Sequence, residues 1–262
     1  MLRLVDAPSA PSAPSPKDRF VTVFGRKPVL EALADADLRV DKVVLADNAR
    51  GTAAREILSA AEARLVRVER ASAHRVKVLA GNGKQDQGVL ADVVAPRMRR
   101  LSDALSGSLS SGALSSVLLL DGITTPANVG MILRTATAAG IDGIVVPRRG
   151  VASLDPLVVK ASAGVAFHAP VLRCYTAGEA AAALRSAGFP LFALSGSAPT
   201  SLFTASLPPR AAYVLGGETD GVSDEVRAAL TGSLSIPMSG GVESLNVASA
   251  AAVLCFELVR RR

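Results

Sequence analysis

The chain has 262 residues, of which 49% are hydrophobic and 20% charged, so we expect one large or two modest globular domains and not a disordered chain. The formal net charge of +6 favours a polyanionic partner, although the same balance is common in proteins that bind no nucleic acid. The sequence has two histidines, two cysteines, no cluster of these residues, no apolar run of membrane-spanning length and no secretory signal. We therefore expect no metal, no membrane and a cytoplasmic location.

Residues 1–19 are rich in Pro, Ser and Ala, which predicts a disordered tail. Residues 20–96 alternate between helical and extended patterns, which predicts a small α/β unit that can fold alone. The run Gly81–Lys84 lacks the first glycine and the Ser/Thr of a phosphate loop, so we expect a simple turn there. The expected helices of this unit are 28–36, 52–64 and 71–80, and the expected strands are 42–46, 65–68 and 88–94.

Residues 97–116 have the composition of a linker. A basic run, Arg97-Met98-Arg99-Arg100, is followed by a stretch rich in Ser, Gly, Leu and Ala with little charge. The arginines could clamp phosphates or form a solvated junction, and the sequence favours neither.

Residues 117–262 alternate regularly between strands and helices, which predicts a mostly parallel sheet covered on both faces. Ligands of such sheets bind beyond the carboxyl ends of the strands. Cys174 and Cys255 lie in apolar runs, so we expect two buried thiols in a reducing compartment. The expected strands are 117–120, 143–146, 170–173, 191–194, 212–215 and 234–237; the expected helices are 128–139, 157–163, 177–187, one capped by Ser223, and 247–258.

Two groups of polar residues follow strands of this sheet. Asn128 is expected to cap the helix 128–139, and Arg134 is turned away from Met131 and Ile132, which are expected to pack inward. Glu218 lies among glycines directly beyond a buried strand, which places its carboxylate at the edge of the sheet. Taken singly, Asn128 and Arg134 are usually a helix cap and an exposed charge, whereas the glycines around Glu218 argue against a merely solvated carboxylate.

The turn Ile236–Ser249 is the strongest candidate for a ligand site. Pro237 ends a short apolar run, Gly240 and Gly241 allow close backbone approaches, and Ser244 is a plausible N-cap. The helix 247–258 is almost wholly apolar, so we expect it to be buried. Polar groups at the mouth of a buried helix indicate a polar ligand.

Two common kinds of site are missing from the sequence. No G-x-G-x-x-G fingerprint follows the first strand of the sheet, and His168 stands apart from every motif, so no Ser-His-Asp set is formed. The remaining Arg, Asn, Glu and Ser residues, with their glycines, can hold a charged polar ligand and orient a hydroxyl without a metal or a covalent intermediate.

Together these elements resemble the SpoU (TrmH) family of RNA ribose 2′-O-methyltransferases, and particularly its 23S rRNA-modifying members. The matching motifs are Asn128-Val129-Gly130 with Arg134, Gly216-Gly217-Glu218 with Gly221, and Ile236-Pro237-Met238 with Ser244-Leu245-Asn246. The segments Gly25–Leu33 and Gln87–Val89 resemble the family's substrate-binding domain, which is related in shape to ribosomal protein L30e. One departure is Gly217, where many relatives carry a larger residue.

The resemblance implies an α/β fold: an L30e-like RNA-binding domain over 20–96 and, over 117–262, a parallel-sheet methyltransferase domain with a deep trefoil knot. It implies S-adenosyl-L-methionine as cofactor, RNA (23S rRNA foremost) as substrate and a homodimer with the catalytic pocket close to the partner chain. Residues that match cofactor-binding positions are Leu215, Gly216, Ile236, Met238 and Leu245, and those that match catalytic positions are Arg134, Asn128, Glu218, Ser244 and Asn246.

Arg134 matches the family's catalytic arginine, either as the base that deprotonates the ribose hydroxyl or as an electrostatic stabiliser of the developing alkoxide. Three alternatives stay open from the sequence: a non-catalytic RNA-binding protein that keeps the fold, an enzyme acting on tRNA, and a nicotinamide-dependent oxidoreductase. The missing glycine fingerprint disfavours the last.

Overall fold

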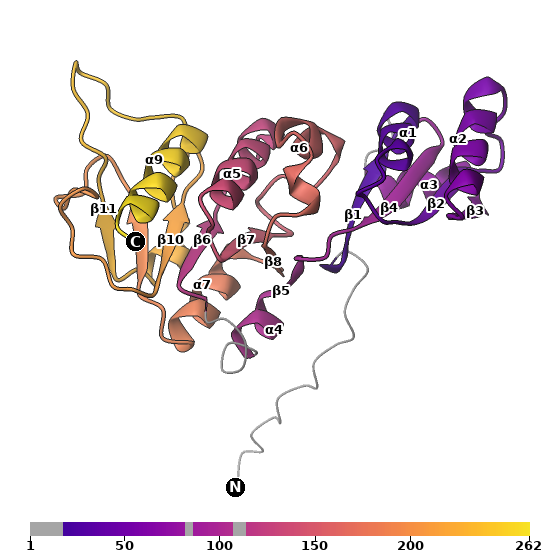
Figure 1. The fold of residues 1–262 in the computed structure, drawn as a ribbon. Coiled ribbons are helices and arrows are strands. Elements are labelled where there is room, and N and C mark those ends of the chain that lie inside the picture. Colours follow the sequence, from indigo (N-terminus) through magenta and orange to yellow (C-terminus); the bar gives the residue numbers. More distant parts are fainter. Residues whose placement is uncertain (1–17, 82–85, 107–113) are drawn as a thin grey trace, which may run out of the picture.

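The computed structural model describes residues 18–81, 86–106 and 114–262, so the expected tail up to residue 17 and most of the turn at Gly81–Lys84 lie outside the described residues. The described residues form two sheets, which lie in separate parts of the molecule (Figure 1). One has four strands in the order β1-β4-β2-β3, and the other has seven in the order β11-β9-β10-β6-β7-β8-β5.

The four-stranded sheet is mixed. Strand β4 pairs antiparallel with β1 and β2, and β2 pairs parallel with β3. The sequence had not indicated β1, and the strand expected at 65–68 begins at Arg67 because Leu65 adopts a positive φ of 55° in the turn after α2. The elements are β1 (Phe20–Phe24), α1 (Arg26–Ala34), β2 (Val40–Ala46), α2 (Thr52–Ala63), β3 (Arg67–Ala71), α3 (Ala73–Ala80) and β4 (Val89–Val94).

Every strand pair of the seven-stranded sheet is parallel, so the expected parallel α/β architecture is confirmed. The elements are β5 (Arg99–Arg100), α4 (Leu101–Ser106), β6 (Ser116–Leu120), α5 (Pro126–Ala138), β7 (Gly143–Pro147), α6 (Pro156–Ala161), the 3-10 helix η3 (Val165–Phe167), β8 (Val171–Cys174), α7 (Ala177–Ser186), β9 (Leu191–Leu194), β10 (Ala211–Leu215), α8 (Asp224–Arg227), β11 (Gly232–Leu234) and α9 (Val247–Arg260).

Part of the segment expected to be a linker is ordered secondary structure. Strand β5 joins the edge of the large sheet by pairing with β8, and α4 buries Leu101 and Ala104 in the core. Composition had concealed both elements, because a two-residue strand has no periodicity and Ser and Gly dominate the residues that follow.

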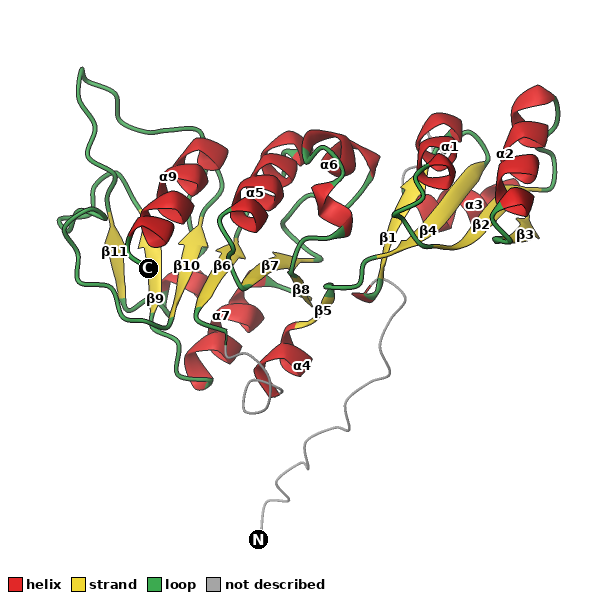
Figure 2. Cartoon of the chain, viewed as in Figure 1, coloured by secondary structure: helices red, strands yellow, loops and turns green. Residues whose placement is uncertain are grey.

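Helices cover both faces of the large sheet. Helices α5, α6 and α9 lie on one face, and α4 and α7 lie on the other (Figure 2). The side chains of β6 alternate between the two layers: Leu118 and Leu120 join the core under α5 and α9, while Val117 and Leu119 join the core over α7. Burial of β6 on both faces explains its unbroken apolar sequence.

Several expectations about single residues are wrong. Helix α5 begins at Pro126 after the N-cap residue Thr125, so Asn128 is a buried residue of the first turn and no cap. Asn246, not Ser244, caps α9. Met131 is 41% exposed although Ile132 is buried as expected. Ser223 does occupy the N-cap position of α8, but its side chain makes no capping bond.

The last helix and one of the two cysteines are also more exposed than expected. Helix α9 buries one face only, and Phe256 and Val259 are 53% and 38% exposed. Cys255 is buried, which raises the pKa of its thiol to about 12, whereas Cys174 is only partly buried. Within the described ranges, no helix has both the length and the apolar character needed to cross a membrane.

Candidate active site

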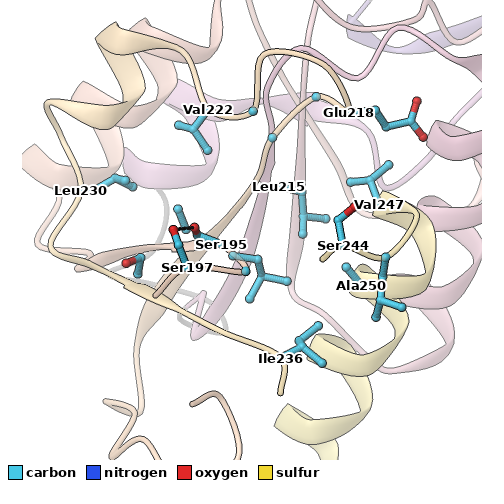
Figure 3. A pocket seen from close by; sticks show the side chains of 18 of the residues that line it. Ser195, Ser197, Leu215, Glu218, Val222, Leu230, Ile236, Ser244, Val247 and Ala250 are labelled. Carbon is cyan, nitrogen blue, oxygen red and sulfur yellow. Dashed lines mark hydrogen bonds between the residues drawn. The ribbon is translucent and has the colours of Figure 1, made fainter. Parts of the chain in front are cut away.

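Three segments meet beyond the carboxyl ends of neighbouring strands in the large sheet. They are the loop after β9 around Ser195, the glycine-rich loop 216–222 after β10, and the segment from Ile236 to Val247 that leads into α9. Figure 3 shows the side chains of Leu215, Ile236 and Ala250 around the space that these segments enclose. The position agrees with the expectation that ligands bind at this edge of a parallel sheet.

Asp121 fastens the loop after β10 to the end of β6. Its buried carboxylate accepts a 2.7 Å hydrogen bond from the backbone N–H of Ser223, and its own N–H donates to the carbonyl of Leu215 at 3.0 Å. A hydrogen bond to an ionised acceptor is stronger than a neutral one. The position of the loop that carries Glu218 is therefore set by the neighbouring strand.

Glycines let the loop after β6 and the loop after β10 approach each other more closely than side chains would allow. A Cβ on Gly217 would lie 2.5 Å from the carbonyl oxygen of Gly122, and a Cβ on Gly216 would lie 2.5 Å from the carbonyl carbon of Gly221. Gly217 and Gly221 also exchange backbone hydrogen bonds of 2.9 and 3.0 Å, which closes the loop on itself. The glycine at 217 is thus required by the contact with Gly122.

Asn128, Glu218 and Asn246 form one hydrogen-bonded group, although they come from three distant parts of the sequence. Nδ2 of Asn128 donates to Oε1 of Glu218 at 2.5 Å, and Nδ2 of Asn246 donates to the same oxygen at 3.2 Å. Nδ2 of Asn246 also donates to Oδ1 of Asn128 at 3.1 Å. The sequence had indicated all three residues, and the structure brings their side chains together.

The cap of α9 orients the amide of Asn246. Its Oδ1 accepts from the backbone N–H groups of Ala248 and Ser249 at 2.9 and 3.4 Å. Because Oδ1 is engaged at the helix end, Nδ2 must face Asn128 and Glu218. One residue therefore both begins the helix and completes the polar group.

The cavity beside this group has a volume of about 860 Å³, within the range of small-molecule sites in proteins. The five residues expected to bind the cofactor all line this cavity: Leu215, Gly216, Ile236, Met238 and Leu245. Ser244 lines it as well. One part of the cavity wall is made of apolar side chains and another of exposed glycine backbone. Such a wall suits a ligand with an aromatic base and a charged polar portion, so the lining residues fit S-adenosyl-L-methionine.

The sequence had missed part of the cavity wall. Ser195 and Ser197 lie on the loop after β9, with their hydroxyl oxygens 3.0 Å apart, and both line the cavity with Val222 and Leu230 (Figure 3). Only the place of this loop, at the carboxyl end of a predicted parallel strand, could have indicated it.

Arg134 does not join the polar group within one chain. It is exposed on α5, it does not line the cavity, and among the described residues no hydrogen bond or ion pair links it to Glu218 or Asn246. It lies three residues beyond Met131, so the two side chains share the exposed stripe of the helix.

Solved structures identify the class to which this fold and site belong. The chain is similar to a TrmH-family protein from Porphyromonas gingivalis, with 32% identity and a TM-score of 0.60 over 94% of this chain and 91% of that one. It is also similar to the SpoU methyltransferase AviRb from Streptomyces viridochromogenes, solved in complex with AdoMet, with 26% identity and a TM-score of 0.59 over 92% and 89%. Both comparisons point to the SpoU class of methyltransferase.

Family models match both parts of the chain. The model of the SpoU rRNA Methylase family matches residues 115–256, and the model described as RNA 2′-O ribose methyltransferase substrate binding matches residues 22–99. A relative from Xanthomonas axonopodis pv. citri, named 23S rRNA (guanosine-2′-O-)-methyltransferase RlmB, is 34% identical over 87% of this chain and 91% of its own length. The chain belongs to the SpoU rRNA methylase family, which confirms the resemblance drawn from its motifs.

Proposed function

We propose that this protein transfers a methyl group from S-adenosyl-L-methionine to a ribose 2′-oxygen of 23S rRNA. The observation that carries the proposal is the Asn128–Glu218–Asn246 group beside a cofactor-sized cavity, in a chain of the SpoU family. The RlmB relative supports 23S rRNA, and a guanosine within it, as the substrate. An rRNA substrate also favours a cytoplasmic enzyme.

The cofactor would lie in the cavity, against Leu215, Gly216, Ile236, Met238 and Leu245. When bound, S-adenosyl-L-methionine supplies an electrophilic methyl group carried on a sulfonium. Most of the protein's contribution to such an in-line displacement is the positioning of the two reactants. The hydrogen bonds that hold the loop of Glu218 to β6 and to α9 support this role.

The ribose hydroxyl is a weak nucleophile, so its proton must be removed or its developing charge stabilised. We assign Asn128, Glu218, Ser244 and Asn246 to orienting the ribose, and Arg134 to stabilising the alkoxide. Arg134 is ordinarily protonated, which suits a stabilising cation better than a base.

A homodimer would bring Arg134 to the site. Met131, Phe256 and Val259 leave an apolar exposed surface on α5 and α9, which pack against each other in one chain. Burial of this surface against a second copy would carry Arg134, on the same stripe of α5 as Met131, toward the partner's polar group.

Two further parts of the proposal concern the fold. We propose that the segment between β11 and α9 is threaded as a deep trefoil knot, since it returns to line the same cavity as the loops after β9 and β10. We also propose that residues 20–96 form an L30e-like domain that selects the RNA, in agreement with the substrate-binding family match over 22–99.

Transfer of tritium from methyl-labelled S-adenosyl-L-methionine tests the function directly. Purified protein is given 23S rRNA, 16S rRNA and tRNA, each lacking modification, and the labelled RNA is digested to locate the 2′-O-methyl nucleotide. Label on a ribose of 23S rRNA is the expected result. Label on tRNA alone would mean that tRNA, and not 23S rRNA, is the substrate. Folded protein that binds the cofactor but labels none of these RNAs would favour a non-catalytic RNA-binding protein.

A further inference from the structure

An exposed aromatic side chain and an arginine lie together at the carboxyl ends of β7 and β8, outside the cavity. Tyr175 is 54% exposed, and the guanidinium carbon of Arg149 lies 5.7 Å from the centre of its ring. We call these two residues the Arg149–Tyr175 platform. Neither residue belongs to the polar group or to the wall of the cavity.

Backbone pairing fixes the positions from which the two side chains of the platform extend. The N–H of Arg148 donates to the carbonyl of Cys174 at 3.0 Å, and the N–H of Arg149 donates to the carbonyl of Tyr175 at 3.1 Å. These bonds continue the parallel pairing of β7 and β8 past the ends of both strands. The two side chains therefore extend side by side from paired backbone, and the contact between guanidinium and ring limits the conformations that a ligand must order.

The surroundings of the platform carry more positive than negative charge. Arg148 pairs with the buried Asp18 at 2.5 Å, and Arg173 lies below the surface with its Nη1 donating to the carbonyl of Val146. Burial, and then the charge of Arg148, lower the pKa of Arg173 to about 10, so it stays protonated at neutral pH. Nε of Arg173 is buried and has no hydrogen-bond partner.

A carboxylate close to the platform in sequence, that of Glu179, is held by a helix cap. Glu179 accepts from the backbone N–H of Thr176 in the capping box of α7, so it is directed toward the start of that helix. With Asp18 paired, the guanidinium of Arg149 is the cation that the platform presents to solvent.

The platform lies along the sheet edge from the proposed catalytic group. Strand β6, whose loop leads to Asn128, is separated from β8 only by β7, so the strand ends are about 10 Å apart. The loops are also joined directly, because the N–H of Ala152 donates to the carbonyl of Ile123 at 3.0 Å. A strand of RNA with one ribose at Asn128 could follow this edge to the platform.

We propose that the Arg149–Tyr175 platform binds a single-stranded nucleotide that flanks the methylated one, with its base stacked on Tyr175 and its phosphate beside Arg149. An exposed aromatic ring with an adjacent guanidinium is suited to unpaired bases, because every base has a face that stacks and a duplex hides those faces. The inference rests on the proposed function, since it names further contacts of the same RNA substrate.

Binding of two fluorescein-labelled RNAs, a single strand of mixed sequence and a blunt duplex of equal length, tests the platform by fluorescence anisotropy. Tyr175→Ala is expected to raise the Kd for the single strand about tenfold, and Tyr175→Phe, which keeps the ring, to leave it unchanged. Arg149→Ala is expected to weaken binding and to reduce the slope of log K against log salt by about 0.7. Arg185→Ala, in the last turn of α7 and thus at the end of that helix remote from Tyr175, removes the same charge from an exposed residue and is expected to change neither.

Several results would overturn the platform. One is an unchanged Kd for the single strand in Tyr175→Ala, and another is an equal loss of affinity for the single strand in Tyr175→Phe and Tyr175→Ala. The others are a loss of cofactor affinity in either variant and the absence of measurable single-strand binding by the wild-type protein. Methyl transfer separates this failure from failure of the function. If the wild type labels 23S rRNA while Tyr175→Ala keeps its KM for that RNA, the platform is wrong and the activity stands.

Discussion

Asn246 Nδ2 donates a 3.1 Å hydrogen bond to Oδ1 of Asn128, across 118 residues of sequence. The bond joins the start of α9 to the first turn of α5, and both amides donate to the same oxygen of Glu218. Asn128 is buried, whereas Glu218 and Asn246 are exposed, so the group presents a carboxylate to solvent that is anchored on one buried amide. The arrangement holds the carboxylate in place before any substrate arrives.

The two roles of Asn246 can be separated by a pair of substitutions. Asn246→Ala removes both the cap of α9 and the donor to Glu218, whereas Asn246→Ser keeps a good cap and loses only the donor. We expect the free energy of unfolding of the alanine variant to be about 1 kcal/mol lower than that of the serine variant. Urea denaturation measures that difference, and methyl transfer to rRNA is expected to fall strongly in both.

Unequal activity of the two variants would contradict this separation. If Asn246→Ser retained wild-type transfer while Asn246→Ala lost it, the helix cap and not the amide donor would be the contribution of Asn246 to the site. Cofactor affinity, measured by calorimetry, serves as the control for an intact cavity.

The sequence predicted which residues belong to the polar group, but it did not predict how each of them is held. Glu218 was identifiable because it lies among glycines directly beyond a buried strand, and Asn246 because it belongs to the motif Ser244-Leu245-Asn246 at the mouth of an apolar helix. The expected start of α9 at Val247 is confirmed, but its cap was assigned to Ser244 because Ser and Asn cap helices equally well and both precede the apolar run.

Other features could not be read from one sequence in principle. Asp121 fixes a loop 102 residues away, and Ser195 reaches the cavity from a third strand, so neither role leaves a local pattern. Strand β5 exists only because β8 offers an unpaired edge. The exposure of Met131 reflects which neighbour α5 packs against, which tertiary structure alone determines.

Gly217→Ala tests the close approach of the two glycine loops. Its Cβ would lie 2.5 Å from the carbonyl oxygen of Gly122, so one loop must move. We expect the free energy of unfolding to fall by about 1–3 kcal/mol, the usual cost of overpacking, and cofactor affinity to fall as well, because Gly217 lines the cavity. Gly232→Ala is the matched control, since its Cβ would meet the ring of Phe192 at an ordinary 3.6 Å. Equal effects of the two substitutions in calorimetry would refute the steric argument.

Glu257 makes stability depend on pH through the end of α9. Hydrogen bonds from Arg260, together with those from Arg261, lower its pKa from 4.5 to about 2 against the opposing effect of burial. A carboxylate with a lowered pKa stabilises the fold above its ordinary value and loses that contribution as the pH falls from about 4.5 to 2. We expect Glu257→Gln to lower the free energy of unfolding at pH 7 by about 2 kcal/mol.

The pH dependence provides the control for that substitution. Denaturation of both proteins at successively lower pH should show the difference shrinking below pH 4.5 and vanishing near pH 2. A difference that is constant across this range would mean that the glutamine disturbs packing and that the charge of Glu257 contributes nothing.

Arg134→Ala is expected to lower the rate of methyl transfer by about 10²- to 10³-fold, the usual effect of removing one stabiliser of transition-state charge. Because Arg134 is exposed and does not line the cavity, its loss should leave cofactor affinity and folding unchanged. Arg134→Lys keeps the charge without the planar fork and should recover part of the rate. Cofactor affinity that falls together with the rate in calorimetry would contradict this role.

Mixed dimers decide from which chain Arg134 acts. If the arginine serves the partner's polar group, a dimer of one Arg134→Ala chain and one Glu218→Ala chain contains one complete site, made of Glu218 from the first and Arg134 from the second. Unfolding and refolding the two inactive variants together should then restore about a quarter of wild-type activity, since half of the dimers are mixed and each has one of two sites intact. If Arg134 serves its own chain, every site in every dimer has one defect and the mixture stays inactive. The same measurement on Asn128→Ala mixed with Glu218→Ala is the control, because those two side chains bond within one chain and no mixture of them can complete a site.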